Sequence, residues 1–406
     1  MLFITKCSNN IYKLTVMCVA LMLTQSAYAN QSGVEIVKLP TKSSTQYQYK
    51  QSASPQAAAQ SYNIGVYYFG GWQNNIPGNN INYPWIPIQN YGISHPSDIN
   101  AQRQPMLGWY NDGDPAVVGQ QIAWMNTYGI NYVVFDWYFT NSNTSFLDQS
   151  IQAYMQYQRT NYPQNNKVKF AILWANDYSQ APSSMSDWVT MVKYWVNNYF
   201  NKPEYMLIDN RPVVFIFLTS DFEYHISQFA TTKELLDKAQ SIAIAAGLQG
   251  INFVAGTPAT LPMINSYARD SGYSEVSAYN YHQGPSSTST VSHSYSELDQ
   301  DYRSQWSQFA SIGDLPVIVP MTAGWDKAPW GGSADPLHDN SYSTPAEFKT
   351  HLEAAKTFMD NNLNMTKRTG IICCWNEFGE GSIIEPTKQW GFSYLQQVHD
   401  VFGSTK

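Results

Sequence analysis

The feature that most constrains the fold of this 406-residue chain is a regular alternation of apolar, strand-like runs with segments of helical period. Each run is short and rich in branched and aromatic residues, which is typical of strands buried on both faces of a parallel sheet. Eight such runs can be counted: Ile64–Phe69, Tyr132–Phe139, Lys169–Trp174, Val213–Leu218, Ile251–Ala255, Glu275–Tyr281, Pro316–Pro320 and Gly370–Trp375.

Segments of roughly 12–25 residues with helical spacing of apolar positions separate most of these runs. In Pro115–Tyr128, for example, Val118, Ile122 and Met125 fall on one helical face, and Pro345–Asp360 repeats the pattern. Repeated β–α units predict an α/β fold, a single (β/α)8 TIM barrel that spans residues 61–406. A doubly wound open sheet is the alternative.

The first 60 residues read differently from the rest. Residues 1–29 contain Lys6 and Lys13, then the apolar run Leu14–Leu23, and end on Ala27-Tyr28-Ala29, which is the order of a secretory signal peptide. Residues 30–60 are rich in Ser, Thr, Gln and Ala and predict a disordered spacer. The apolar run is too short for a membrane anchor, so we expect no membrane span after cleavage and a secreted or periplasmic protein.

The composition of the remaining chain favours a sugar ligand. Loss of Lys6 and Lys13 with the leader changes the formal charge from −7 to −9, so a nucleic-acid partner is not expected. Charged residues make up 13% of the chain and aromatic residues 15%. Because aromatic rings stack on the C–H faces of sugars, we expect a polysaccharide or glycan substrate. The oligomeric state is not specified by the sequence.

Cysteine and histidine usage indicates neither a disulfide framework nor a metal centre. After leader cleavage Cys373 and Cys374 remain, and adjacent cysteines do not form an ordinary disulfide without strain. Two buried structural thiols are therefore expected, with a vicinal disulfide as the alternative. The seven histidines show no HxH or HExxH pattern, so no metal site and no cofactor are predicted.

Residues 375–382, Trp-Asn-Glu-Phe-Gly-Glu-Gly-Ser, carry two candidate catalytic carboxylates, Glu377 and Glu380, just after the last strand-like run. Gly379 and Gly381 permit a sharp turn, and residues three apart in a helix-like turn lie roughly 5–6 Å apart. That spacing suits a retaining glycosidase, whose carboxyl groups are about 5–5.5 Å apart, and is below the ~6.5–9.5 Å of inverting enzymes. Two solvated loop charges are the alternative.

Other candidate site residues stand near strand ends, which share the catalytic face of a barrel. We predict that the aromatic ones stack on sugar rings and that the others bond to hydroxyl groups. Core packing or strand-end capping is the alternative for each. The predicted stacking residues are Trp72, Trp137, Trp174, Tyr281 and Trp325, and the predicted hydroxyl-binding residues are Asp136, Asn176 and Asn376.

Loops and turns complete the prediction. Two long segments, residues 73–109 and 284–294, are expected on the catalytic face, where long loops form lids or binding walls. Asp209-Asn210-Arg211-Pro212 predicts the turn of a short hairpin over Tyr205–Pro212. Asp112-Gly113-Asp114 is expected to cap the helix that begins at Pro115 rather than to form a metal site.

The motif at residues 375–386, together with Tyr67-Tyr68-Phe69 on the first strand, resembles glycoside hydrolase family 99-like proteins. These include endo-alpha-mannosidases, endo-mannanases and relatives from polysaccharide gene clusters once described as glycosyltransferases. Phe378 and Gly379 replace the Trp and His that are usual in the endo-mannosidase form. This pattern matches the polysaccharide-cluster branch better and does not specify mannose.

The resemblance implies a (β/α)8 barrel and a retaining mechanism, and it adds Tyr68 to the predicted substrate-binding residues. It also implies that Glu377 assists the substrate's own 2-hydroxyl in attacking C1, while Glu380 protonates the leaving oxygen. A covalent glycosyl-enzyme needs similar spacing and stays open. A glycosyltransferase and a non-catalytic carbohydrate-binding barrel are the alternative functions.

Overall fold

The structure is a computed structural model that describes residues 62–72, 84–139, 145–176, 181–259, 263–284 and 290–403. The predicted leader and spacer lie outside the described residues, as do parts of both predicted long loops.

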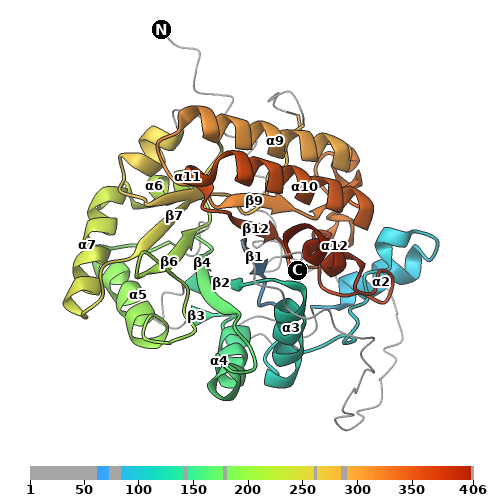
Figure 1. Cartoon of the computed structure of the whole chain (residues 1–406), viewed down its shortest axis with the longest axis horizontal. Coiled ribbons are helices and arrows are strands. Elements are labelled where there is room, and N and C mark those ends of the chain that lie inside the picture. The colour runs from blue at the N-terminus through green and yellow to red at the C-terminus, as the bar shows by residue number, and fades with distance from the viewer. Residues whose placement is uncertain are drawn as a thin grey trace, which may run out of the picture.

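Eight parallel strands in the described part of the chain form a barrel (Figure 1). Their spatial order is β8-β7-β6-β4-β2-β1-β12-β9. Val276 of β8 closes the ring by pairing in parallel with Val317, beside β9. The strands are β1 (Asn63–Tyr68), β2 (Tyr132–Phe139), β4 (Lys169–Trp174), β6 (Arg211–Ile216), β7 (Asn252–Gly256), β8 (Glu275–Ser277), β9 (Val319–Thr322) and β12 (Thr369–Cys373). Each predicted run overlaps one of these strands, which confirms the predicted TIM barrel.

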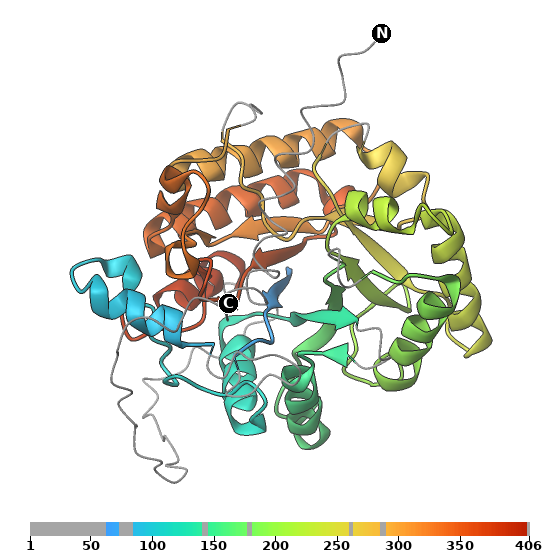
Figure 2. The same cartoon turned by 180° about the vertical axis from the view of Figure 1, so that it is seen from behind.

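Helices surround the strands, as the two opposite views show (Figures 1 and 2). They are α2 (Ile86–Ser94), α3 (Pro115–Tyr128), α4 (Gln149–Asn161), α5 (Met185–Asn198), α6 (Thr219–Ile226), α7 (Thr232–Ala245), α9 (Tyr295–Ile312), α10 (Pro345–Asn361), α11 (Leu363–Thr366) and α12 (Ser393–Phe402). Short turns of helix are η2 (Ile99–Ala101), η4 (Ile264–Arg269), η5 (Ala328–Trp330) and η6 (Pro336–Asn340). None of the helices in the described ranges is long and apolar enough to cross a membrane.

Local sequence signals set the ends of these elements. Asp114 caps α3 by accepting a hydrogen bond from the Ala116 N–H at 2.8 Å, as predicted. The predicted hairpin is also present: β5 (Leu207–Ile208) pairs antiparallel with β6. Its turn residues Asp209 and Asn210 both have positive φ, which suits the twist of a two-residue hairpin loop. Two further small hairpins pair β2 with β3 (Ser145–Phe146) and β10 (Gly324–Trp325) with β11 (Ser341–Tyr342).

A glycine in β1 makes room for a side chain that spans three strands. The ring of Tyr132, from β2, lies over Gly65, and its hydroxyl donates to the carbonyl of Gly370 in β12 at 2.8 Å. A Cβ at Gly65 would overlap that ring. Glycine in a strand interior often marks such a close approach, so Gly65 is part of the packing between β2, β1 and β12.

A buried acid joins β1, α3 and the segment after β12. Glu385 accepts hydrogen bonds from the Tyr110 hydroxyl at 2.7 Å and from the Gln121 amide at 3.1 Å, and Tyr68 donates to Gln121 at 2.9 Å. Burial raises the pKa of Glu385 to about 8, although its two donors act in the opposite direction. Glu385 therefore holds a proton in the folded chain near neutral pH.

We predict that Gly65→Ala lowers the free energy of unfolding by about 1–3 kcal/mol, because the added methyl group overpacks against Tyr132. Chemical denaturation measures this change. Gly284→Ala is the matched control, because a Cβ there meets its nearest neighbour at an ordinary 3.5 Å. Equal stability of both variants and the parent would contradict the packing role of Gly65.

We also predict that Glu385→Gln changes the pH dependence of stability. The folded pKa of about 8 lies above the ordinary 4.5, so between these values the folded state binds a proton that the unfolded state releases. Stability therefore falls as pH rises through this window. The variant has no such proton, so relative to the parent it gains about 3–4 kcal/mol between pH 5 and pH 8. Thermal unfolding at both pH values tests this, with exposed Glu353→Gln as control; a pH-independent difference would contradict it.

Candidate active site

The two predicted catalytic glutamates lie on a tight hairpin that follows β12. Here β13 (Asn376–Glu377) pairs antiparallel with β14 (Ser382–Ile383). The N–H of Glu380 donates to the carbonyl of Glu377 at 3.2 Å, which closes a four-residue turn with one glutamate at each end. Gly381 has φ of 73°, a conformation that favours glycine. The predicted sharp turn between the glutamates is therefore present.

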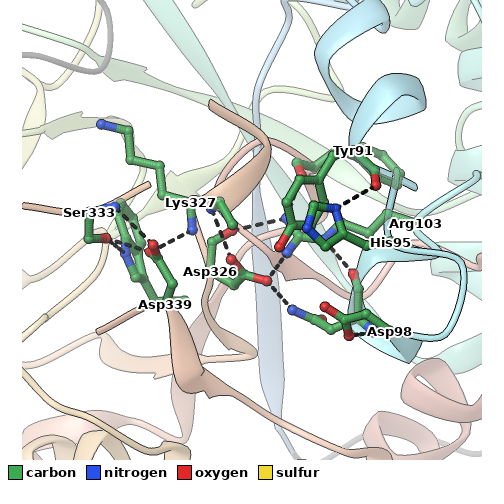
Figure 3. A network of polar contacts seen from close by, with 12 residues as sticks. Tyr91, His95, Asp98, Arg103, Asp326, Lys327, Ser333 and Asp339 are labelled. Carbon is green, nitrogen blue, oxygen red and sulfur yellow. Dashed lines mark hydrogen bonds and ion pairs between the residues drawn. The ribbon is translucent and has the colours of Figure 1, made fainter. Parts of the chain in front are cut away.

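Arg103, a buried arginine in the long connection between β1 and β2, holds this hairpin by hydrogen bonds. Arg103 Nη1 donates to the carbonyl oxygens of Phe378 and Asp326, at 2.9 Å each, and Nη2 pairs with the Asp326 carboxylate. The N–H of Asp326 donates to the Glu380 carbonyl at 2.6 Å. Figure 3 shows Arg103 and Asp326 at the centre of this network. A charge-assisted bond from Arg103 thus fixes the backbone at Phe378, and a backbone bond from Asp326, which Arg103 also holds, fixes it at Glu380.

Asn376 attaches the hairpin to the end of β1. Its side-chain amide makes two hydrogen bonds to the backbone of Phe69, accepting from the N–H at 2.9 Å and donating to the carbonyl at 3.0 Å. The Trp72 indole N–H donates to the Asn376 carbonyl at 2.9 Å. Both polar ends of the amide are therefore occupied by backbone. Asn376 positions Glu377 in this structure, rather than offering its amide to a hydroxyl group.

Three acidic side chains and one tyrosine form the centre of the site. Tyr279, two residues after β8, places its hydroxyl 2.6 Å from Glu377 Oε1 and 3.1 Å from Asp136 Oδ2. Glu377 is 5% exposed, Glu380 9% and Asp136 4%. The structure thus brings the predicted residues Asp136, Glu377 and Glu380 together from β2 and the final hairpin.

Burial and neighbouring negative charges favour the protonated forms of the carboxyl groups in this cluster. Burial, then the charge of Glu380, then that of Asp136, raise the pKa of Glu377 well above its ordinary value, and the Tyr279 hydrogen bond opposes them. Burial is also the main cause that raises the pKa of Asp136. Like charges in a poorly solvated site cannot all ionise together. The cluster therefore keeps protons at neutral pH, as general acid catalysis requires.

The number of hydrogen-bond donors at Tyr279 indicates which carboxyl group is protonated. The Tyr279 hydroxyl carries one proton but contacts two carboxyl oxygens, so one carboxyl group must donate to it. The shorter contact, at 2.6 Å to Glu377, has the length of a hydroxyl bond to a carboxylate. The arrangement that fits is protonated Asp136 donating to Tyr279, which donates to Glu377. Glu377 is then poised to accept a proton.

Tyr279 was not among the predicted binding residues, although it lies in the predicted strand-like run Glu275–Tyr281. Its ring is held in the barrel by Tyr67, at a centroid distance of 4.8 Å, and by Phe217, at 5.3 Å. Tyr67 also contacts Phe215 of β6 across the barrel, at 5.8 Å. An aromatic layer thus supports the carboxylates from inside the barrel.

Four of the predicted sugar-binding aromatic residues are packed inside the protein. Trp137 and Trp174 point outward from their strands and contact Trp195 of α5 at 5.4 and 6.4 Å. Tyr68 faces α3, where it bonds Gln121. Trp72 stacks on Trp85 at 4.0 Å. All four are at most 1% exposed, so none offers a ring face to a sugar in this structure.

The remaining predicted binding residues lie around the mouth but are also engaged. Asn176 bonds both the N–H and the carbonyl of Leu218, at 2.9 and 2.7 Å, the same backbone clamp that Asn376 makes. Tyr281 donates to the Thr257 carbonyl at 3.1 Å. Trp325 donates to Ser333 at 2.9 Å and stacks on His338. These residues shape the surroundings of the carboxylates in this structure.

The expectation of two free thiols is wrong in this structure. Cys373 and Cys374 form a vicinal disulfide, and the peptide bond between them is cis. The cis bond brings the Cα atoms to 2.9 Å, whereas the prediction assumed an extended strand with side chains on opposite faces. Among the described residues, no three His, Cys, Asp or Glu side chains are grouped to hold a metal ion.

Solved structures that resemble the chain share its fold at low sequence identity. One described as a glycoside hydrolase-like protein has a TM-score of 0.61 at 15% identity, covering 88% of this chain and 98% of its own. The GH99 endo-alpha-mannosidase from Bacteroides thetaiotaomicron, in complex with bis-tris propane, has a TM-score of 0.56 at 16% identity, covering 84% of this chain and 95% of its own. No curated protein matches the chain in sequence.

One protein family matches most of the chain. The sequence profile described as "Glycosyltransferase WbsX" covers residues 97–398, a range that contains Asp136, Tyr279, Glu377 and Glu380. Together with the fold of the GH99 enzyme, this match confirms the resemblance to family 99-like proteins and their polysaccharide-cluster relatives. The chain belongs to the family described as glycosyltransferase WbsX.

Proposed function

We propose that the chain is an exported, retaining endo-glycosidase that cleaves internal bonds of a polysaccharide or glycan, with α-mannosides as candidate substrates. The observation that carries the proposal is the buried cluster in which Tyr279 contacts Glu377 and Asp136 beside Glu380. Carboxyl groups gathered at the strand ends of a TIM barrel, with the pKa values of Glu377 and Asp136 raised mainly by burial, supply what glycosidic cleavage needs.

In the proposed first step, Glu380 donates a proton to the glycosidic oxygen while its bond to C1 breaks. Glu377 removes the proton from the sugar's 2-hydroxyl, and that oxygen closes onto C1 to give a 1,2-anhydro sugar. Water then attacks C1 and gives a proton to Glu380, while Glu377 returns its proton to the 2-oxygen. Two displacements at C1 retain the configuration. A covalent bond between C1 and one glutamate is the alternative intermediate.

The family description names a glycosyltransferase, which also acts at an anomeric carbon. Transfer from a sugar nucleotide expels a phosphate group, which needs cationic or backbone N–H stabilisation more than a protonating acid. The site instead places Asp136, Glu377 and Glu380 together, and any ionised member of this group repels a phosphate. The charge distribution therefore supports hydrolysis over transfer.

We predict that Glu377→Gln and Glu380→Gln each reduce glycan cleavage by at least about 1,000-fold, because each removes a proton-transfer group. Release of oligosaccharides from a panel of α-mannans and bacterial exopolysaccharides measures this. Glu353→Gln on the exposed face of α10 is the control for the charge change. Full activity in either site variant would contradict the proposal, and glycan binding without turnover by the parent would favour a binding protein.

Tyr279→Phe removes the hydroxyl group that lowers the pKa of Glu377. The pKa of that base should then rise, and the acid limb of the kcat/KM profile should move to higher pH. We expect kcat to fall by about 10- to 100-fold as well, the cost of one hydrogen bond to a charged group. A pH–rate profile checks both effects. An unchanged acid limb would contradict the assignment of Tyr279 as the donor to Glu377.

A further inference from the structure

A lysine beside the catalytic hairpin has no charged partner. Lys327 lies between β10 and η5, and its backbone is fixed: its N–H donates to Asp339 at 3.0 Å, and its carbonyl accepts from Trp330 and Gly332 at 2.9 and 3.1 Å. The residue is 9% exposed. No hydrogen bond or ion pair joins its ammonium group to any residue within the described ranges.

The two acids nearest to Lys327 in this loop are already engaged. Asp326 pairs with Arg103. Asp339 accepts from the Lys327 N–H and from the N–H and hydroxyl of Ser333, the last two at 2.9 and 2.6 Å. Figure 3 shows the Lys327 side chain extended away from both carboxylates. Its positive charge is therefore not neutralised within this network.

The charge of Lys327 acts on a neutral histidine, His282. Burial, then His338, then Lys327 itself lower the pKa of His282 to about 3. His338 Nδ1 lies 2.8 Å from the Ser292 carbonyl and so must donate to it, and His338 Nε2 then accepts from His282 Nδ1 at 3.2 Å. Trp325 packs against both rings. His282, on which the Lys327 charge acts, is therefore neutral and does not compensate that charge.

The loop that carries Lys327 also lies next to the catalytic turn. The residue before it, Asp326, donates its N–H to the Glu380 carbonyl at 2.6 Å. Trp330, three residues after it, packs so closely on the turn that a Cβ at Gly379 would overlap its ring. His282 belongs to the segment that carries Tyr279. The loop that carries Lys327 therefore borders the turn that carries the two glutamates.

A mostly buried lysine side chain without a charged partner is costly, and an anion that binds its ammonium group recovers part of that cost. We propose that Lys327 forms a subsite for an anionic substituent, so that the substrate is an acidic polysaccharide carrying carboxylate, sulfate or phosphate groups near the cleaved bond. The inference rests on the proposed glycosidase function, of which it names the substrate class. The overall charge of the chain is negative and does not attract an acidic polysaccharide. We therefore assign the selectivity for acidic polysaccharides to the local positive charge of Lys327.

The test compares a single polysaccharide, mannan, in neutral and in negatively charged forms. The probes are neutral α-mannan, the same mannan oxidised to carry carboxylates at C6, the same mannan chemically sulfated, and yeast phosphomannan. Binding is measured by calorimetry on the full chain carrying Glu380→Gln, which prevents turnover, with Lys327 intact or changed to Met or Arg. Lys238→Met, on the exposed face of α7, is the matched control for the loss of a lysine.

We expect at least one acidic mannan to bind about 10-fold or more tighter than neutral mannan, and the derivative that does so identifies the anion. Lys327→Met should abolish that preference while leaving neutral binding within about twofold, Lys327→Arg should keep it, and added salt should weaken it. Equal affinity for charged and neutral forms, equal loss of both in Lys327→Met, or no binding of any probe would overturn the subsite.

Cleavage assays with Glu380 intact separate the two proposals. If the Lys327→Met variant and the parent cleave neutral mannan equally well and neither prefers acidic forms, the glycosidase function stands and the subsite is refuted. If an acidic mannan binds through Lys327 but is not cleaved, the anion subsite stands and the glycosidase function is refuted.

Discussion

The clamp between Asn376 and Phe69 is the interaction on which the site depends. Parallel pairing of β1 with β12 brings the ends of these strands together, and the Asn376 amide continues that contact for one more residue by bonding both backbone groups of Phe69. Trp72 then bonds the Asn376 carbonyl. Since Glu377 follows directly, its backbone position is set by the barrel itself rather than by a mobile loop. Arg103 performs the same task on the far side of the turn.

Around this fixed turn, aromatic side chains provide the packing, and acidic side chains provide the reactive groups. Large aromatic side chains pack between strands and helices or fill the barrel interior, where they exclude water and leave few charges. The acidic side chains that remain are buried, and their pKa values rise because the surroundings solvate charge poorly. The Tyr279 hydroxyl bonds to both Asp136 and Glu377, which places the proton on Asp136 and leaves Glu377 as the acceptor. The loop that borders this turn carries a cationic side chain, that of Lys327.

Sequence patterns predicted much of this architecture, and the errors have physical reasons. Strand runs, the α3 cap and the Asp209–Pro212 turn depend on local preferences that short segments carry. Trp137 and Trp174 were assigned to the sugar site because they stand at strand ends, but side chains alternate between faces along a strand. Asp136 points inward, so Trp137 next to it points toward the helices. That alternation could have excluded both indoles. The partners of Tyr279, by contrast, come from segments far apart in the sequence, and the Cys373–Cys374 disulfide accompanies a cis peptide bond that the strand pattern does not predict.

The most direct test of the account is the anomeric configuration of the first product, followed by NMR while the purified chain cleaves a polysaccharide. A turn that brings two buried carboxyl groups together predicts two successive displacements at C1 and a product with the configuration of the substrate. A product of inverted configuration would show that water attacks C1 directly, and would contradict the roles assigned to Glu377 and Glu380.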